Sequence, residues 1–207
     1  MNYLSVENIS KSFGARTLFE GVSFGINKDQ KIAFVAKNGT GKSTILSIIN
    51  GLDFPDTGQV VIRKGIRMEF LSQEPNLQDE LTVEESIFAS DNEILKVIER
   101  YEKALENMDD QEEYQLAFDQ MDRFNAWDFE TQYKQILFKL KLEDLKAKVK
   151  NMSGGQRKRL ALAIILINKP DLLILDEPTN HLDLEMIEWL EDYFAKENIT
   201  LFMVTHD

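Results

Sequence analysis

The chain has 207 residues, none of them cysteine, and its 36 acidic and 24 basic residues give a formal net charge of −12. The lack of cysteine excludes disulfides, thiolate catalysis and zinc–thiolate sites. No apolar run approaches 18 residues and the N-terminus has no secretory pattern, so we expect a cytoplasmic globular protein without direct membrane insertion. Its acidic surface tells against broad nucleic-acid binding by this chain alone.

The N-terminal part of the sequence predicts strands. Apolar residues alternate in two runs of residues 2–26, which is typical of a β-hairpin: Leu4, Val6 and Ile9, then Val22, Phe24 and Ile26. The apolar run Ile32–Val35 predicts a buried strand, and Ile45–Ile49 predicts a helix.

A glycine-rich segment joins this strand to this helix. It reads Ala36-Lys37-Asn38-Gly39-Thr40-Gly41-Lys42-Ser43-Thr44. A strand, a glycine loop, Lys-Ser and a helix are the context of a phosphate-binding P-loop, whose N–H groups surround the phosphate. Lys42 would reach the β- and γ-phosphates and Ser43 would hold Mg²⁺. Ala36 replaces the first glycine of the motif, a change that is strained only if its φ is positive.

The middle of the chain predicts two short strands and then helices. Strands are expected around Gln59–Ile62 and Arg67–Leu71, and the pattern from Leu81 to about Lys148 is helical. Residues 91–130 are acidic, with 13 Asp or Glu against four Lys or Arg. Apolar residues in this part form two helical faces separated by Asn107–Asp110, which predicts a helical hairpin: Ile94, Leu95, Ile98, Tyr101 and Leu105, then Tyr114, Ala117, Phe118 and Met121.

Two further motifs lie in the last third. Ser153-Gly154-Gly155-Gln156 precedes a strong helix-forming run, so Ser153 is either a helix cap or part of a second anion site. The apolar strand 171–175 ends at Asp176-Glu177, at the sheet edge where the P-loop is expected. Asp176 suits Mg²⁺ through its bound water and Glu177 suits a general base, although an ordinary turn would explain this pair alone. A helix from Leu184 to Lys196 and a strand over 199–204 follow.

Taken together, these motifs resemble the ATP-binding cassette (ABC) family. The tetrapeptide Ser153–Gln156 is similar to its signature motif, and Asp176-Glu177 to its Walker B pair. Other positions match further family motifs: Phe13 the aromatic residue that stacks on adenine, Gln73 the Q-loop glutamine, Leu182-Asp183 the D-loop and His206 the switch histidine. The resemblance implies an α/β P-loop NTPase fold with a β-subdomain, a RecA-like core and a helical subdomain.

Two segments narrow the resemblance to the ABC-F branch. Residues 177–183 read "EPTNHLD", and 126–130 are similar to the Uup-like proteins of that branch. This resemblance implies that the chain is the first of two cassettes of a longer protein, and that the cassette is truncated at its C-terminal end. The full-length protein would act on the ribosome. An arm insertion is expected near 91–125. We expect the β-subdomain and P-loop core over 1–73, the helical subdomain over 74–150, and the signature helix, Walker B strand and switch region over 151–207.

The resemblance also implies a mechanism with ATP and Mg²⁺. Ser43, Gln73 and Asp176 would hold the metal, Glu177 would be the catalytic base, and His206 would contact the γ-phosphate. The signature motif would serve the ATP site of the second cassette. A membrane-transporter ATPase subunit is the alternative function, and a nucleotide-dependent binding module with negligible turnover is a third.

Overall fold

The computed structural model describes residues 1–36, 39–107 and 109–205. The chain forms two compact units. The first consists of Met1–Gln73 and Lys169–Asp207, and the second of Glu74–Asn168.

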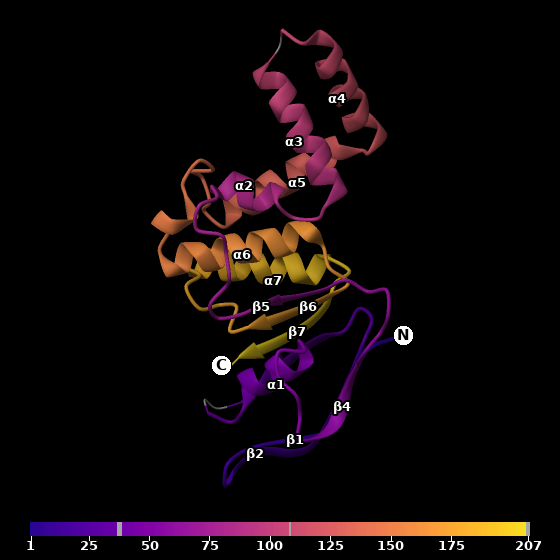
Figure 1. The fold of residues 1–207 in the computed structure, drawn as a ribbon, viewed down its shortest axis with the longest axis vertical. Helices are drawn as coiled ribbons and strands as arrows, with labels where there is room; N and C mark the ends of the chain where they lie inside the picture. Colours follow the sequence, from indigo (N-terminus) through magenta and orange to yellow (C-terminus); the bar gives the residue numbers. More distant parts are fainter. Residues whose placement is uncertain (37–38, 108, 206–207) are drawn as a thin grey trace. The chain divides into compact units, whose positions relative to one another are not determined.

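An antiparallel sheet of three strands opens the first unit (Figure 1). Its strand order is β2-β1-β4, with these bounds: β1 Asn2–Phe13, β2 Arg16–Asn27 and β4 Thr57–Ile62. The apolar residues of β1 that alternate in the sequence are buried, including Leu4, Val6 and Ile9. The predicted hairpin over 2–26 is therefore confirmed, and the strand after Asp56 completes its sheet.

A parallel sheet of four strands forms the rest of the β-structure of this unit. Its order is β3-β7-β6-β5, with these bounds: β3 Lys31–Val35, β5 Met68–Leu71, β6 Leu172–Asp176 and β7 Thr200–Thr205. Every residue of β6 is buried, as its unbroken apolar sequence predicts for a central parallel strand. Val35 pairs with Thr205 and Asp176 with Val204, so the carboxyl ends of these strands share one edge.

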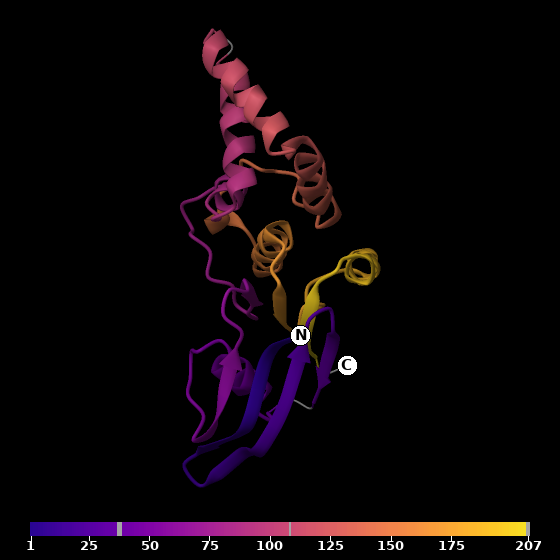
Figure 2. The same cartoon turned by 90° about the vertical axis from the view of Figure 1, so that its right-hand side faces the viewer.

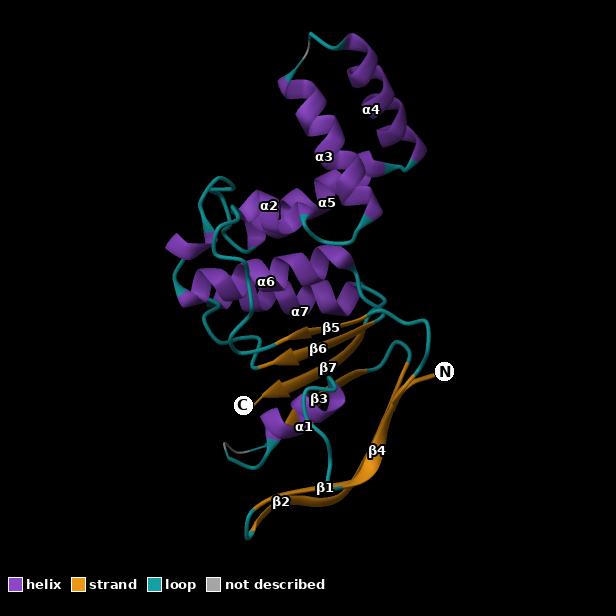
Figure 3. Ribbon diagram, viewed as in Figure 1, coloured by secondary structure: helices purple, strands orange, loops and turns teal. Residues whose placement is uncertain are grey.

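Two helices cover the parallel sheet (Figure 3). Helix α1 (Lys42–Ile49) lies between the parallel and antiparallel sheets, and its Leu46 and Ile49 join one core with Ile174 and Phe202. Helix α7 (Leu184–Lys196) lies on the opposite face and is seen end-on in Figure 2. The β3–α1 connection thus carries the P-loop to the carboxyl edge of the sheet.

The second unit is helical. It contains five α-helices and a 3₁₀ turn within its described residues: α2 Val83–Phe88, α3 Glu93–Glu106, α4 Gln111–Arg123, α5 Ala126–Lys139, η1 Val149–Asn151 and α6 Gly154–Asn168. Side chains cap the starts of α2, α3 and α4, because Thr82, Asn92 and Asp110 accept hydrogen bonds from the first-turn amides.

Helices α3 and α4 form a hairpin. The predicted break over Asn107–Asp110 lies between them, with Met108 outside the described residues. Four rings join the hairpin to the start of α5, with centroids 5.0–6.4 Å apart: Tyr101, Tyr114, Phe118 and Trp127. This aromatic cluster explains why a hairpin with so much negative charge still packs.

The prediction of helix up to Lys148 is wrong at its C-terminal end. Helix α5 stops at Lys139, and Lys141 has a positive φ of 54°. The following segment bonds instead to the start of α2, where Val83 N–H donates to the Ala147 carbonyl at 3.0 Å and Thr82 pairs with Lys148. Tertiary hydrogen bonds replace the local helix here.

The described helices contain no stretch that is both long and apolar enough to cross a bilayer. The second unit extends to Asn168, so α6 and the predicted signature motif belong to it.

Candidate functional site

The carboxyl edge of the parallel sheet gathers the predicted catalytic segments of the first unit. Ala36 N–H donates to the Thr205 carbonyl at 3.3 Å, which holds the start of the P-loop beside the end of β7. On the other side of β7, Glu177 N–H donates to the Val204 carbonyl at 2.9 Å. Strand β7 therefore holds the P-loop and the Walker B segment on its two sides.

Lys42 and Glu177 meet as a buried ion pair. The Lys42 ammonium donates to Glu177 Oε1 at 3.0 Å and to the Ala36 carbonyl at 2.8 Å. The two residues are only 7% and 3% exposed. A buried ion pair has a high desolvation cost and is weak evidence for stability, so this pair is a candidate functional feature.

The backbone at Glu177 is unusual. Its φ is +48°, in the left-handed region that non-glycine residues rarely adopt. Such strain costs about 1–3 kcal/mol and persists where the surrounding structure enforces it. Asp176 precedes it at the end of β6 and is 4% exposed. The strained turn therefore gives two adjacent carboxylates different positions, with Glu177 directed to Lys42.

The glycines of the P-loop have a steric role. Gly41 caps α1 with a φ of +92°, and a Cβ there would lie 3.0 Å from Phe19 Cδ1. Gly39 also has a positive φ, of 78°. Ala36 is not among the described residues with positive φ, so its methyl group adds no backbone strain.

The predicted metal ligands lie on the same unit. Ser43 is in the first turn of α1, Asp176 ends β6, and Gln73 follows β5, whose Leu71 pairs with Leu175. Hydroxyl, carboxylate and amide oxygens are the hard donors that Mg²⁺ takes. Among the described residues, no group of three or more His, Asp or Glu is arranged so that it could hold a metal ion by itself. These donors suit a Mg²⁺ that is completed by phosphate oxygens and water.

The predicted adenine platform lies at the end of the β1–β2 hairpin. Phe13 is 58% exposed and pairs with Arg16 across the hairpin. Arg16 Nη2 donates to the Gly39 carbonyl at 3.3 Å, so the hairpin contacts the P-loop directly.

One face of the Phe13 ring is approached by a lysine. Lys11 Nζ lies 5.6 Å from the ring centroid, within the range of a cation–π contact. The same ammonium donates to Asp53 Oδ1 at 2.8 Å and to the Phe54 carbonyl at 2.6 Å. The hydrogen bond from Lys11 holds the pKa of Asp53 below its ordinary value. Sequence reasoning missed Lys11 and Arg16, although two basic residues flanking the aromatic residue were a visible signal.

The signature motif lies in the second unit and caps α6. Gln156 N–H donates to Ser153 Oγ at 3.3 Å, while Ser153 N–H donates to Gln156 Oε1 at 2.8 Å. This reciprocal capping box confirms the cap prediction for Ser153, and the role in a second ATP site stays a prediction. Asp183 similarly caps α7 by accepting from Met186 N–H at 3.0 Å. Three predicted site residues lie outside the described residues: Lys37, Asn38 and His206.

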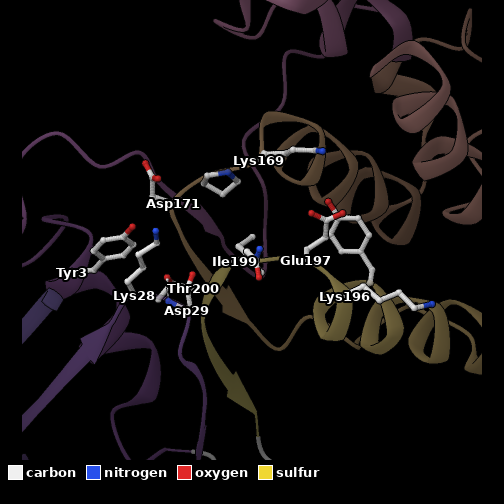
Figure 4. A pocket seen from close by; sticks show the side chains of 12 residues that line it. Tyr3, Lys28, Asp29, Lys169, Asp171, Lys196, Glu197, Ile199 and Thr200 are labelled. Atoms are coloured by element: carbon white, nitrogen blue, oxygen red, sulfur yellow. Dashed lines mark hydrogen bonds between the residues drawn. The ribbon is translucent and has the colours of Figure 1, made fainter. Parts of the chain in front are cut away.

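A separate cavity of about 450 Å³ lies at the opposite, amino edge of the parallel sheet (Figure 4). Three lysines and three carboxylates line it: Lys28, Lys169, Lys196, Asp29, Asp171 and Glu197. Neither charge prevails there, so this cavity is less suited to a phosphate than the P-loop edge.

The model of the family described as "ABC transporter" matches residues 19–180. The chain belongs to this family. The matched range contains both the P-loop of this ABC cassette and its Walker B pair, so the family assignment covers the two segments that meet at Lys42 and Glu177.

The cassette is also similar in sequence to several named proteins of greater length. The cassette is 43% identical over its whole length to an uncharacterized ABC transporter ATP-binding protein, YfmR, of Bacillus subtilis, of which it covers 34%. Over 98% of its length it is 34% identical to the energy-dependent translational throttle protein EttA of Mycobacterium tuberculosis and 38% identical to ABC transporter F family member 2 of Arabidopsis thaliana, covering 38% and 32% of them. The cassette thus spans about a third of the length of these relatives, one of which is named as an ABC transporter F family member.

A solved structure confirms the predicted fold class. It is the ATP-binding cassette MJ0796 in a dimeric, post-hydrolysis state bound to ADP and Pi. The likeness has a TM-score of 0.66 and 25% identity and covers 99% of this chain and 88% of the other.

Proposed function

We propose that this cassette binds and hydrolyses ATP at the carboxyl edge of its parallel sheet. The buried contact between Lys42 and Glu177 carries this proposal, because it joins the P-loop lysine to the Walker B glutamate across 135 positions of sequence. Each residue type has a role in the reaction: an ammonium that binds phosphate and a carboxylate that accepts a proton from water.

ATP binding requires this contact to change. The phosphates of ATP compete with Glu177 for the Lys42 ammonium, so their arrival releases the carboxylate. Glu177 then accepts a proton from the attacking water while Lys42 remains on the β- and γ-phosphates. Ser43, Gln73 and Asp176 would hold Mg²⁺, Asp176 through a bound water, and the ion would supply charge neutralisation at the phosphates. His206 hydrogen-bonds the γ-phosphate in this proposal.

A single cassette leaves this site incomplete. One P-loop and one signature motif are present in the chain, and in the proposed mechanism they act in different ATP sites. We propose that Ser153, Gly154, Gly155 and Gln156 contact ATP bound to a second cassette in the full-length protein. Because relatives are about three times as long, a second cassette has room in such a protein.

We propose an ABC-F role in translation for the full-length protein, in which this cassette is the first of two. The "EPTNHLD" run and the similarity to a protein named as a translational throttle support this assignment. We propose that the α3–α4 hairpin is the arm insertion expected near 91–125. Closure of the two cassettes around ATP would drive work on the ribosome in the cytoplasm.

A transporter subunit is the alternative, favoured by the description of the matched family. Sedimentation of the full-length Glu177→Gln variant in ATP separates the two functions. The ABC-F proposal expects ATP-dependent recovery with purified ribosomes and no enrichment on membranes, with ADP as the control. Recovery with membranes alone would reject it.

Binding and turnover test the cassette itself. Isothermal titration with Mg-ATP should give saturable binding that Lys42→Ala removes. The specific ATPase activity of the isolated cassette should be low and rise with protein concentration, because transient dimers form by mass action. Constant, high specific activity at nanomolar protein would instead show a complete site in one chain.

A further inference from the structure

The end of the β1–β2 hairpin connects two parts of the proposed nucleotide site. Phe13 and Arg16 are partners across the hairpin, one offering a flat exposed ring and the other a guanidinium. Arg16 Nη2 lies 3.3 Å from the Gly39 carbonyl in the P-loop. Arg16 therefore connects the two parts, because it is the strand partner of Phe13 and is hydrogen-bonded to the P-loop.

Arg16 has the chemistry to bind an anion at this place. A guanidinium has five N–H donors and no acceptor, and the bond to Gly39 uses one of them. Within the described part of the chain, no carboxylate forms an ion pair with Arg16. The side chain is exposed, so a phosphate can reach its remaining donors.

Lys11 restricts where adenine can stack. Its ammonium approaches one face of Phe13, and its side chain is only 12% exposed and is bonded to Asp53. A base that stacks on Phe13 must use the other face.

We infer that Arg16 is a nucleotide-positioning residue that binds the α-phosphate. The inference rests on the proposed ATP site. A nucleotide with adenine on Phe13 and its β- and γ-phosphates at Lys42 must carry its ribose and α-phosphate across the space between them. Arg16 lies at the same end of the hairpin as Phe13, and its side chain already contacts the P-loop at Gly39.

The test compares ligands that differ in phosphate number. Affinities of the protein for adenosine, AMP, ADP and ATP are measured by competition with a fluorescent ATP analogue, for the wild type and Arg16→Ala. An arginine contact to the α-phosphate predicts a loss of about ten-fold or more for AMP, ADP and ATP alike, with adenosine unchanged. Arg16→Lys should recover part of the loss, because it retains the charge without the bidentate fork.

Arg63→Ala is the matched control. It removes the same charge from the other end of the same sheet, beside Ile62, which pairs with Leu4. Its affinities should equal those of the wild type. Equal losses in both variants would attribute the effect to net charge and overturn the inference.

The remaining outcomes separate the inference from the function on which it rests. A loss for ADP and ATP but not for AMP would mean that Arg16 acts only by holding Gly39. A loss that includes adenosine would mean that it only holds the hairpin. Unchanged ATP affinity would remove Arg16 from the site and leave the function intact, whereas no binding of Mg-ATP by the wild type would reject the function itself.

Discussion

The carboxyl edge of the parallel sheet and the α3–α4 hairpin use ion pairs in opposite ways. Lys42 and Glu177 are 135 positions apart and almost fully buried. Arg100 and Glu113 are 13 positions apart, with side chains 38% and 39% exposed, although their two bonds of 2.6 and 2.8 Å have better geometry. Good hydrogen-bond geometry therefore does not identify the ion pair whose loss should destabilise the protein more. Burial identifies that pair, because water cannot replace the lost partner of a buried charge.

The largest effect should come from breaking the buried pair in the nucleotide-free protein. Lys42→Met leaves the Glu177 charge buried without its 3.0 Å partner, and such losses typically cost about 3–5 kcal/mol of stability. Lys42→Met/Glu177→Gln removes both charges and should be more stable than Lys42→Met alone. Urea unfolding without nucleotide measures both. Equal stability of the single and double variants would show that the two charges do not interact.

The second effect concerns turnover at the same pair. Glu177→Gln should retain ATP binding and lose about two decades or more of ATPase rate, because an amide cannot accept the proton of water. Phosphate release at saturating ATP measures the rate, and titration of ATP checks that binding persists. Near-normal release would show that another group is the base.

The exposed pair should respond much less. Replacing Arg100 or Glu113 by alanine should change the stability of the hairpin much less than breaking the buried pair changes that of its unit, since water screens an exposed ion pair. The double variant completes a cycle that isolates the pair itself. A coupling as large as that of the buried pair would contradict the role assigned to burial.

Sequence predicted the fold where local and tertiary preferences agree. The helix over Leu184–Lys196 was predicted with its observed bounds, and the Walker B strand was displaced by one residue at each end. The segment from Lys141 to Lys148 was predicted as helix but bonds to residues near Thr82, since a partner distant in sequence overrides its helical pattern.

The site was predictable only in part for the same reason. The P-loop and the two carboxylates have spacing and neighbours that predict their chemistry. The bond from Lys42 to Glu177 and that from Arg16 to Gly39 depend on how separate segments approach each other, which no local pattern encodes. The adenine-stacking role of Phe13 was predicted from resemblance, and the basic residues that flank it are visible in the sequence, but no local pattern shows that Lys11 lies against the ring.

The smallest effect concerns pH and contrasts two carboxyls of the hairpin. Burial raises the pKa of Glu102, although Tyr133 donates to it at 3.1 Å. The hydrogen bond from Arg100 instead lowers the pKa of Glu113. These shifts must affect folding with opposite sign, because each reports which state holds the proton more tightly.

For Glu102, the folded state keeps its proton above the ordinary pKa of 4.5, where the unfolded chain has already released it. Stability therefore falls as pH rises from about 4.5 through the raised pKa and is constant above it. For Glu113, stability is present above 4.5 and is lost as pH falls through the lowered pKa. Glu102→Gln should remove the first dependence and Glu113→Gln the second, measured as differences from wild-type urea unfolding between about pH 3 and 8. A pH dependence of the unfolding free energy for Glu102→Gln that stays parallel to that of the wild type would show that burial of this carboxyl has no energetic consequence. Even the partly covered charges of the hairpin would then behave like fully solvated ones.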